Sequence, residues 1–167
     1  MVKSKVLRVL GIDPGTAITG WGIMDFESRQ RKVIAYGVVR TEANSPMPMR
    51  LSKLHKELNE IIGEFCPVVA AIEDLFFFKN AKTVITVGQA RGVAILSCVN
   101  SGLEVYEYTP LQVKQTVTGY GRAEKKQMQE MVRMLLNLKE IPKPDDAADA
   151  IAVAYTHSVF QETINNS

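Results

Sequence analysis

The sequence predicts an α/β protein in which a mixed five-stranded sheet is flanked by helices on both faces. Three β-rich runs occupy the first 40 residues, and short apolar runs then alternate with segments of helical periodicity. Strands joined by short turns pair antiparallel, whereas strands separated by helices are expected to pair parallel. We therefore expect three antiparallel strands followed by two parallel strands, in the order β-β-β-α-β-α-β-α-α-α.

The first three strands are predicted from their apolar content and from the turn residues between them. Val6–Asp13 is a dense apolar run that stops at Pro14-Gly15. Gly20–Phe26 and Lys32–Arg40 follow, separated by the polar stretch Glu27–Arg31. Because the connections are short, these runs are expected to form an antiparallel meander.

Helical periodicity begins after the loop Thr41–Pro48. Met49–Phe65 places its leucine and isoleucine side chains on one face and its charged side chains on the other, and Pro67 stops the helix. Val68–Ile72 is apolar throughout, which is typical of an interior strand covered on both faces. The centre of the chain thus predicts a helix and then a buried strand.

The remaining elements are predicted from apolar periodicity and from glycine and proline residues at their ends. Residues 1–160 are predicted to form a single domain and residues 161–167 a polar, frayed tail. His55 and His157 are expected on helix surfaces, without an assigned role. We expect a strand over Leu103–Tyr108 and helices over Asn80–Asn100, from Pro110 to near Gly119, over Glu124–Leu138 and from Asp145 or Asp146 to about Phe160.

Composition and charge exclude several classes of protein. The 167 residues carry 20 Lys and Arg against 18 Asp and Glu, and 46% are hydrophobic, as in a globular protein. Two cysteines cannot build a disulfide framework, and no apolar stretch reaches the roughly 20 residues of a membrane-spanning helix. A reduced, cytoplasmic setting is therefore expected. Between residues 79 and 139, nine basic residues stand against four acidic ones, a pattern that either an anion-binding surface or scattered solvated helix faces would produce.

Acidic side chains fall at positions where strands end or helices begin. Asp13 ends the first strand, Glu73 ends the fourth, and Asp146 and Asp149 lie on one face at the start of the last helix. Simpler explanations exist for each: a turn with Pro-Gly for the first, solvation for the second, and a helix cap for Asp145 or its neighbour. The residues around the first acid are small or rigid, so we expect a large ligand to approach the backbone there: Gly11, Pro14, Gly15 and Gly20.

A shared crevice for these acids would demand cations. If the sheet closes as expected, Asp13, Glu73, Asp146 and Asp149 meet at the strand ends. Two bare carboxylates about 4 Å apart repel by about 4 kcal/mol at an effective dielectric near 20, so the cluster needs protons or cations. Four carboxylates balance two divalent ions, and an all-oxygen site favours Mg²⁺ or Mn²⁺. Paired metals about 3.5–4 Å apart suit in-line phosphoryl displacement.

Six short blocks occur in order along the chain, between about Leu7 and His157. They are Gly11-Ile12-Asp13-Pro14-Gly15-Thr16, Ile72-Glu73-Asp74-Leu75-Phe76, Gly88-Gln89-Ala90-Arg91-Gly92-Val93-Ala94, Gln112-Val113-Lys114-Gln115-Thr116-Val117, Ala123-Glu124-Lys125 and Asp146-Ala147-Ala148-Asp149-Ala150. Together they resemble the RuvC family of bacterial Holliday junction resolvases. Any one block is a weak signal, whereas six in register are highly specific.

The resemblance implies a ribonuclease-H-like fold, a homodimer and Mg²⁺-dependent cleavage of four-way DNA junctions in recombination and repair, with Mn²⁺ able to substitute. Two symmetric nicks would leave 5′-phosphate ends, and the RuvA–RuvB branch-migration complex would be a partner. Phe76 matches an aromatic residue that stacks near the junction centre, and Lys114 and Lys125 match lysines that contact DNA or support catalysis. The family's catalytic and metal-binding carboxylates, for two ions, correspond to Asp13, Glu73, Asp146 and Asp149.

The residues themselves also indicate a DNA-binding surface. Three successive phenylalanines follow Glu73 and cannot all face one core, so at least one should be exposed and able to stack on an unpaired base. The stretch Gly119–Lys126 is glycine-hinged and basic, which suits phosphate, although an ordinary helix start would look the same. The candidate DNA contacts are Phe76, Phe77, Lys79, Lys82, Arg91, Lys114, Tyr120, Arg122, Lys125 and Lys126.

Two other functions fit parts of the sequence. Asp13-Pro14-Gly15-Thr16 resembles the first phosphate loop of actin-like ATPases and sugar kinases, which need two such lobes where this chain has one. A non-catalytic nucleic-acid-binding module with a structural cation would bind four-way DNA without nicking it. The helix Asn80–Asn100 is apolar on more than one side, so one of its faces could meet a partner chain.

Overall fold

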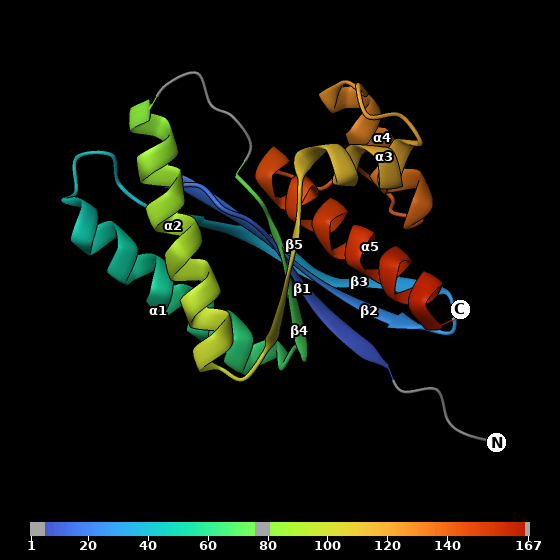
Figure 1. Ribbon diagram of the computed structural model, residues 1–167, viewed down its shortest axis with the longest axis horizontal. Coiled ribbons are helices and arrows are strands. Elements are labelled where there is room, and N and C mark those ends of the chain that lie inside the picture. The colour runs from blue at the N-terminus through green and yellow to red at the C-terminus, as the bar shows by residue number, and fades with distance from the viewer. Residues whose placement is uncertain (1–5, 76–80, 166–167) are drawn as a thin grey trace.

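The structure, a computed structural model, describes residues 6–75 and 81–165 (Figure 1). Its elements follow the predicted order, and their bounds differ from the predicted ones mainly at the ends. They are β1 (Leu7–Asp13), β2 (Ile18–Glu27), β3 (Gln30–Arg40), α1 (Met47–Phe65), β4 (Val69–Glu73), α2 (Ala81–Asn100), β5 (Glu104–Tyr108), α3 (Pro110–Thr118), α4 (Lys125–Leu135) and α5 (Asp145–Asn165).

The five strands form one mixed sheet in the order β3-β2-β1-β4-β5. The first three strands pair antiparallel, and β4 and β5 extend the sheet in parallel to β1. The predicted fold class is therefore confirmed. The first strand lies in the middle of the sheet, which explains its dense apolar sequence, because a central strand of a covered sheet has no solvent-facing side.

Helices cover both faces of this sheet. On one face, α1 and α2 pack on residues such as Leu10 and Ile72. On the other face, α3, α4 and α5 pack on residues such as Val9 and Ala71. Neighbouring residues Val9 and Leu10 are both fully buried because successive side chains of a strand point to opposite faces. Among residues 6–75 and 81–165, no helix combines the length and the apolar character needed to cross a membrane.

Helix α5 lies unusually close to the sheet because glycines on β1 and β2 leave room for its backbone. A Cβ atom on Gly11 would lie 2.1 Å from the carbonyl oxygen of Ala150, and one on Gly20 would lie 1.9 Å from that of Asp146. The expectation that these glycines open the backbone to a large ligand is therefore wrong. They admit the last helix instead, and its buried alanines complete the close contact.

Helix α5 extends beyond its predicted end. The helix continues to Asn165, although we expected it to stop near Phe160. Glu162 accounts for the difference, because its carboxylate pairs with Arg31 at 2.6 Å and with Arg29 at 3.0 Å. These ion pairs fasten the last turns to the hairpin between β2 and β3, which a polar sequence could not reveal.

Of the two histidines expected on helix surfaces, His157 was wrongly placed. His157 is fully buried, and its Nδ1 lies 2.8 Å from the hydroxyl oxygen of Tyr108. Burial lowers the pKa of this imidazole to about 4, so it is neutral at physiological pH. His55 is half-buried between α1 and α2, where its Nδ1 lies 2.8 Å from the hydroxyl oxygen of Ser97. The two side chains therefore belong to the packing of the fold.

Candidate metal centre and nucleic-acid interface

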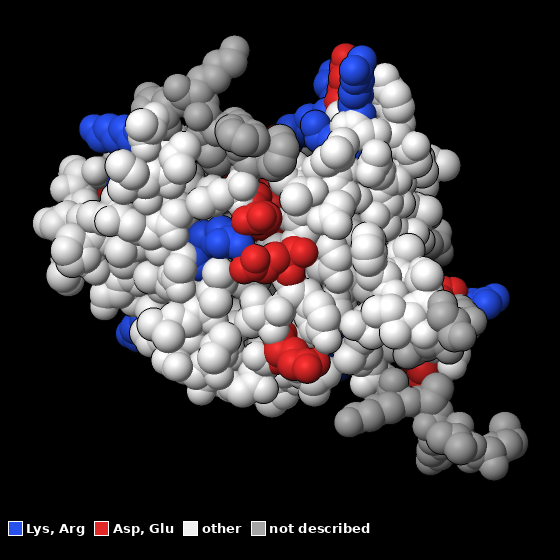
Figure 2. Space-filling model, in the orientation of Figure 1, with Lys and Arg blue, Asp and Glu red and all other residues white. Residues whose placement is uncertain are grey.

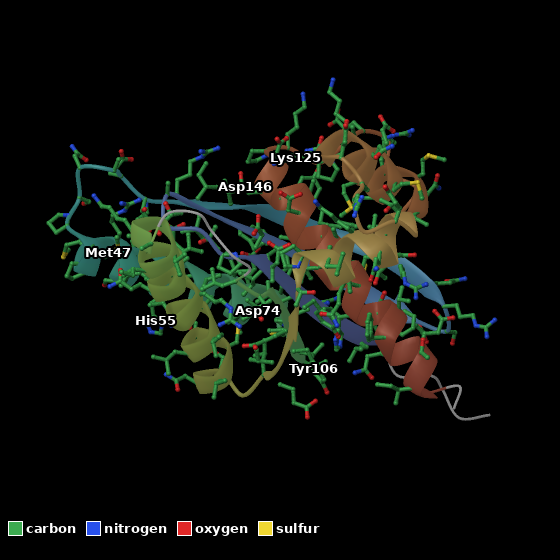
Figure 3. The ribbon with its side chains drawn as sticks, turned by 45° about the horizontal axis from the view of Figure 1, so that its top comes forward. Met47, His55, Asp74, Tyr106, Lys125 and Asp146 are labelled. Carbon is green, nitrogen blue, oxygen red and sulfur yellow. The ribbon has the colours of Figure 1, made fainter. Side chains whose placement is uncertain are left out.

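The four candidate carboxylates come to one end of the sheet from three separate elements. Ile12 pairs with Ile72, so the next residues, Asp13 and Glu73, end two adjacent parallel strands side by side. The close approach of α5 then brings its first turns over this edge. Figure 3 shows this N-terminal end of α5, marked by Asp146, beside Lys125.

Among the acids of the site, Asp13 has the largest shift in pKa. Burial raises the pKa of its carboxyl group to about 9, with further contributions from Glu73, Asp149 and Asp146 in that order. The pKa of Glu73 rises to about 7, again through burial first and then through Asp149. At neutral pH the Asp13–Glu73 pair therefore retains a proton, because burial and the neighbouring charges disfavour two ionised carboxylates. Without a cation, the site holds a proton in its place.

Two lysines partly neutralise the negative charge of this cluster. Lys114 on α3 lowers the pKa of Glu73 and so opposes the effect of burial. Lys125, at the start of α4, places its Nζ 3.5 Å from Asp149 and 3.3 Å from Asp145. Burial nevertheless prevails at Asp149, whose pKa is raised. The exposed Asp145 has a lowered pKa, because the polar side chain of Gln129 and the ammonium group of Lys125 favour its charged form.

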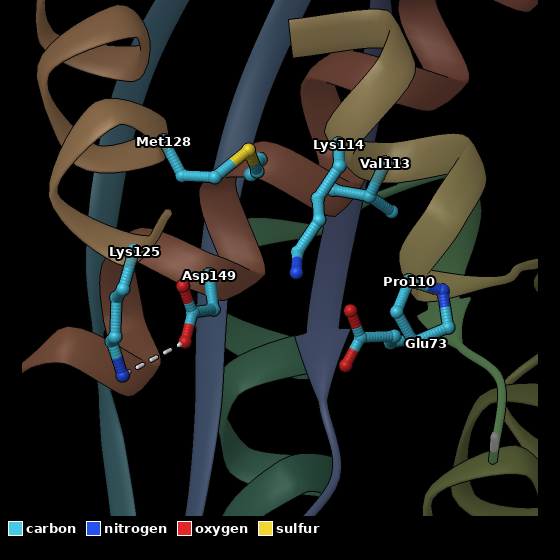
Figure 4. Close-up of a pocket in the computed structure, with 8 residues that line it drawn as sticks. Glu73, Pro110, Val113, Lys114, Lys125, Met128 and Asp149 are labelled. Carbon is cyan, nitrogen blue, oxygen red and sulfur yellow. Dashed lines mark ion pairs between the residues drawn. The ribbon is translucent and has the colours of Figure 1, made fainter. Parts of the chain in front are cut away.

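A pocket of about 210 Å³ opens between these side chains. Figure 4 shows Lys114 and Lys125 reaching into it, while Glu73 and Asp149 present their carboxylates from the sheet and from α5. A smaller hollow of about 80 Å³ lies next to it and is lined by Asp13 and, again, by Glu73. Glu73 thus stands on the wall between the two spaces, where it can serve a ligand in either one.

The donor set fits hard divalent cations in chemistry and in charge. The converging groups are carboxylates, which are the ligands that Mg²⁺ and Mn²⁺ prefer. In residues 6–75 and 81–165, no three acidic, histidine or cysteine side chains already close on one point as a finished metal cage would. After burial, repulsion from Glu73, Asp149 and Asp146 contributes to the raised pKa of Asp13, and a cation would relieve that repulsion as the proton does.

Comparison with known proteins places this geometry in a family. A family profile described as "Crossover junction endodeoxyribonuclease RuvC" matches residues 9–157. The chain belongs to the RuvC family. A RuvC of Finegoldia magna is 58% identical over 151 residues, covering 90% of this chain and 92% of the relative. A RuvC of Brevibacillus brevis is 52% identical over 161 residues, covering 96% of this chain and 97% of the relative.

Solved structures of RuvC agree with the fold described above. Thermus thermophilus RuvC matches with a TM-score of 0.86 at 34% identity, covering 94% of this chain and 96% of that one. The same protein in complex with a Holliday junction substrate matches with a TM-score of 0.88, also at 34% identity and with the same shares of the two chains covered. These matches confirm the ribonuclease-H-like fold that the RuvC resemblance implied.

Nine of the ten predicted DNA contacts of this RuvC family member divide into three groups. Phe76, Phe77 and Lys79 lie outside the described residues. Lys114 and Lys125 line the pocket beside the acids. The third group, Lys82, Tyr120, Arg122 and Lys126, is exposed on the surface. On the face drawn in Figure 2, Lys and Arg side chains project at the upper right and acidic side chains gather near the middle.

The turn between α3 and α4 presents most of that third group. Gly119 ends α3 in the left-handed conformation, with φ at 72°. Tyr120 follows it with 58% of its surface exposed, and the amide nitrogen of Glu124 donates to the side chain of Gln127 in a capping box that starts α4. Glycine at the left-handed position and a firm helix start therefore hold the basic stretch in a defined turn.

Arg91, one of the predicted DNA contacts, pairs with two acids. Its Nη2 lies 3.0 Å from an oxygen of Asp74 and 2.7 Å from one of Glu107, and only 17% of its side chain is exposed. These two carboxylates neutralise the guanidinium within the protein, and contact with DNA stays a prediction for this residue. Sequence reasoning missed both partners, although the position of Asp74 directly after Glu73 was a signal that it would lie near the site.

Proposed function

We propose that this chain is a metal-dependent endodeoxyribonuclease that resolves four-way DNA junctions by nicking two strands symmetrically. Its membership of the crossover junction endodeoxyribonuclease family supports this proposal, as does its likeness to a RuvC bound to a Holliday junction. The observation that carries it is the convergence of half-buried acids at the strand ends, where the pKa of Asp13 reaches about 9. Such a cluster of like charges is costly to folding, and a metal-dependent active site explains why it is kept.

Asp13, Glu73, Asp146 and Asp149 would hold the ions, which we take to be two Mg²⁺, with Mn²⁺ able to substitute. When bound, such ions activate water and stabilise negative charge that develops on the leaving oxygen. This hydrolysis would leave 5′-phosphate ends.

The basic residues would place the DNA backbone over the acids. Lys114 and Lys125 enter the pocket from α3 and α4, so their ammonium groups suit phosphates next to the scissile bond. Arg122, on the turn before α4, and Lys126, in the first turn of α4, are both exposed and would hold a phosphate further along the strand. Phe76 would stack on a base at the junction centre, and Tyr120 offers a second aromatic surface.

A homodimer would supply the second cut. Helix α2 packs Ala90 and Ala94 against the core, yet its opposite side exposes Ile85, Leu96 and Val99 at 62%, 54% and 54%. These apolar side chains fall on one stripe of the helix, which suits pairing with a second copy. A two-fold dimer matches the pseudo-two-fold symmetry of a four-way junction and points one active site at each of two strands.

Two further expectations rest on family membership alone. Action in the cytoplasm, where recombining DNA lies, and cooperation with the RuvA–RuvB branch-migration complex both follow from the family rather than from a described surface.

A denaturing gel of a labelled mobile four-way junction tests the proposal directly. The wild-type protein should give two symmetric nicks with Mg²⁺ and none with a chelator. Asp13→Asn should bind the junction in a gel shift and leave it uncut, because it keeps the shape of the side chain and removes its charge. If the wild type binds the junction and never nicks it with Mg²⁺ or Mn²⁺, the chain is a binding module with a structural cation. If Asp13→Asn cuts at the normal rate, the assignment of the site is wrong.

A further inference from the structure

A bridge of charged side chains joins helix α2 to the edge of the sheet that carries Glu73. Arg91 provides its centre, with one guanidinium nitrogen shared between Asp74 at 3.0 Å and Glu107 at 2.7 Å. The first acid follows β4 and the second lies on β5, so a single side chain ties two neighbouring strands to one helix. Figure 2 shows a basic side chain next to the acidic group in the middle of the face.

This bridge holds the turn directly after Glu73. One carboxylate oxygen of Asp74 accepts a hydrogen bond from the backbone amide of Leu75 at 2.8 Å and forms the ion pair with Arg91. The backbone amide of Asp74 donates to the carbonyl oxygen of Tyr108 at 2.8 Å, which carries the sheet pairing one residue past Glu73. The backbone on the C-terminal side of Glu73 is therefore fixed at three points.

Glu107 fixes the neighbouring strand in the same way. Its pairing partner in the sheet is Ile72, and the next residue, Tyr108, pairs with Glu73. Without Arg91, the carboxylates of Asp74 and Glu107 would be like charges close to the acids of the site. The guanidinium thus removes repulsion as well as binding the two strands together.

The part of helix α2 that carries Arg91 is packed tightly against its neighbours. Its neighbour Ala90 and the residue one turn later, Ala94, are fully buried against the sheet. Gly88, one turn earlier, faces the side chain of Leu75, with a distance of 3.5 Å to the site of a Cβ atom. Helix α2 is therefore packed on both sides of the arginine, so the guanidinium can act as a fixed point for the strands.

We propose that Arg91 is a positioning residue that presents Glu73 to the metal site by clamping Asp74 and Glu107. The inference deepens the proposed function and rests on it, since it assigns Glu73 to metal binding. Groups that orient metal ligands without touching the metal commonly contribute 10–100-fold to metal affinity, so we expect loss of the clamp to weaken binding about tenfold. DNA binding should not change, because Arg91 presents little surface to a partner.

Calorimetric titration with Mn²⁺ in the absence of DNA measures this effect directly. The test variant is Arg91→Met, which keeps the packing of the stem and removes both ion pairs. The matched control is Arg8→Met at the opposite end of the sheet, where Arg8 donates to both carboxylate oxygens of Asp25 at 2.7 and 2.9 Å. The two variants lose comparable ion pairs, so thermal unfolding should show a similar loss of stability in both.

Only Arg91→Met should bind Mn²⁺ about tenfold more weakly and need correspondingly more Mg²⁺ for half-maximal cleavage, with junction affinity unchanged. Arg91→Lys retains the charge and should recover part of the affinity. If Arg91→Met does not fold, Glu107→Gln carries the test, with a smaller shift in the same direction expected. Equal Mn²⁺ affinity in wild type and variant, or an equal loss in Arg8→Met, would overturn the inference.

Glu73→Gln separates this inference from the proposed function. If that variant loses Mn²⁺ binding while the wild-type protein cuts no junction, the nuclease proposal fails and the role of Arg91 in shaping the metal site can still be measured. If the wild type cuts and Glu73→Gln does not, while Arg91→Met has normal metal affinity, the inference about Arg91 alone is wrong.

Discussion

Charged side chains are paired with opposite charges at one end of the sheet and clustered with like charges at the other. At the end where β1 begins, Arg8 donates to both oxygens of Asp25 and to the carbonyl oxygen of Phe65 at 2.9 Å. At the end where β1 stops, Asp13 lies among other acids, and burial with their repulsion raises its pKa to about 9. The first arrangement satisfies each charge, whereas the second leaves like charges together.

Helix α5 runs between these two ends and shows the same contrast within one element. Its last turns carry Glu162, which pairs with Arg31. The guanidinium of Arg31 also lies over the rings of Phe26 and Tyr155. Its first turns carry Asp149, whose burial raises its pKa although Lys125 lies 3.5 Å away. Natural proteins keep unfavourable charge clusters where a ligand will neutralise them, so the contrast marks the functional end of the fold.

The largest expected effect is a difference in activity between variants of Asp149 and Glu162, which lie near opposite ends of α5. Asp149→Asn should lower the rate of junction cleavage by about a thousandfold or more, because a lost metal ligand removes several kcal/mol of charge stabilisation. Glu162→Gln, at the other end of the same helix, should cut at the wild-type rate. Single-turnover cleavage of a labelled junction measures both. Similar losses in both variants would show that the helix as a whole, and not its acidic end, controls activity.

The next effect concerns the glycines that bring α5 to the sheet. Gly20→Ala places a Cβ atom 1.9 Å from the carbonyl oxygen of Asp146 and should cost about 1–3 kcal/mol of unfolding free energy, with a loss of cleavage as well. Gly63→Ala on α1 meets nothing within 4 Å and should stabilise the protein by about 0.5–1 kcal/mol. Chemical denaturation compares them. An unchanged stability in Gly20→Ala would mean that α5 does not need this close contact.

A third effect is the pH dependence of stability without metal. Folding raises the pKa of Asp13 from 3.8 to about 9, so the folded protein keeps a proton that the unfolded chain has released. This stabilisation is complete below pH 3.8 and is lost as the pH rises through about 9. The melting temperature in chelator should therefore fall between about pH 7 and 9, a range in which His157 is neutral in both states.

Asp13→Asn should flatten that decline and raise the melting temperature at alkaline pH, by about 2–4 °C for each kcal/mol of repulsion removed. Added Mg²⁺ should stabilise the wild type more at about pH 9 than at about pH 7, because more carboxylates are then charged. Differential scanning calorimetry across this range provides the measurement. A wild-type profile that is flat, or that rises with pH, would contradict the buried, like-charged character of the site.

The smallest expected effect concerns the end of the fold where each charged side chain has a partner of opposite charge. Glu162→Gln loses the ion pairs with Arg29 and Arg31 and should cost about 1 kcal/mol, since partly exposed pairs contribute little. Hydrogen exchange should show faster opening of the last turns of α5, with the rest of the helix unchanged. If stability rises instead, this end also carries unrelieved charge, and the contrast between the two ends disappears.

Most of the fold could be predicted from the sequence, because local periodicity determines which segments become strands or helices. The order of the ten elements and the mixed sheet are confirmed, and predicted ends such as those at Asp13, Phe65 and Tyr108 match the structure. The predictions that failed depend on partners far away in the chain. His157 can be buried because the hydroxyl group of Tyr108 lies within hydrogen-bond distance of its ring. Helix α5 reaches Asn165 because Glu162 forms ion pairs with two arginines of a hairpin that is distant in the sequence.

The amino-acid sequence specifies the kinds of residue at the strand ends and, through its ordered motifs, the family. Which charged side chains meet depends on how the elements pack. Asp13 and Glu73 become neighbours through the parallel register of β1 and β4, while Arg91 pairs with Asp74 and Glu107. The physical reason is that a helix or strand follows from nearby side chains, whereas an ion pair or a carboxylate cluster depends on how closely distant elements pack.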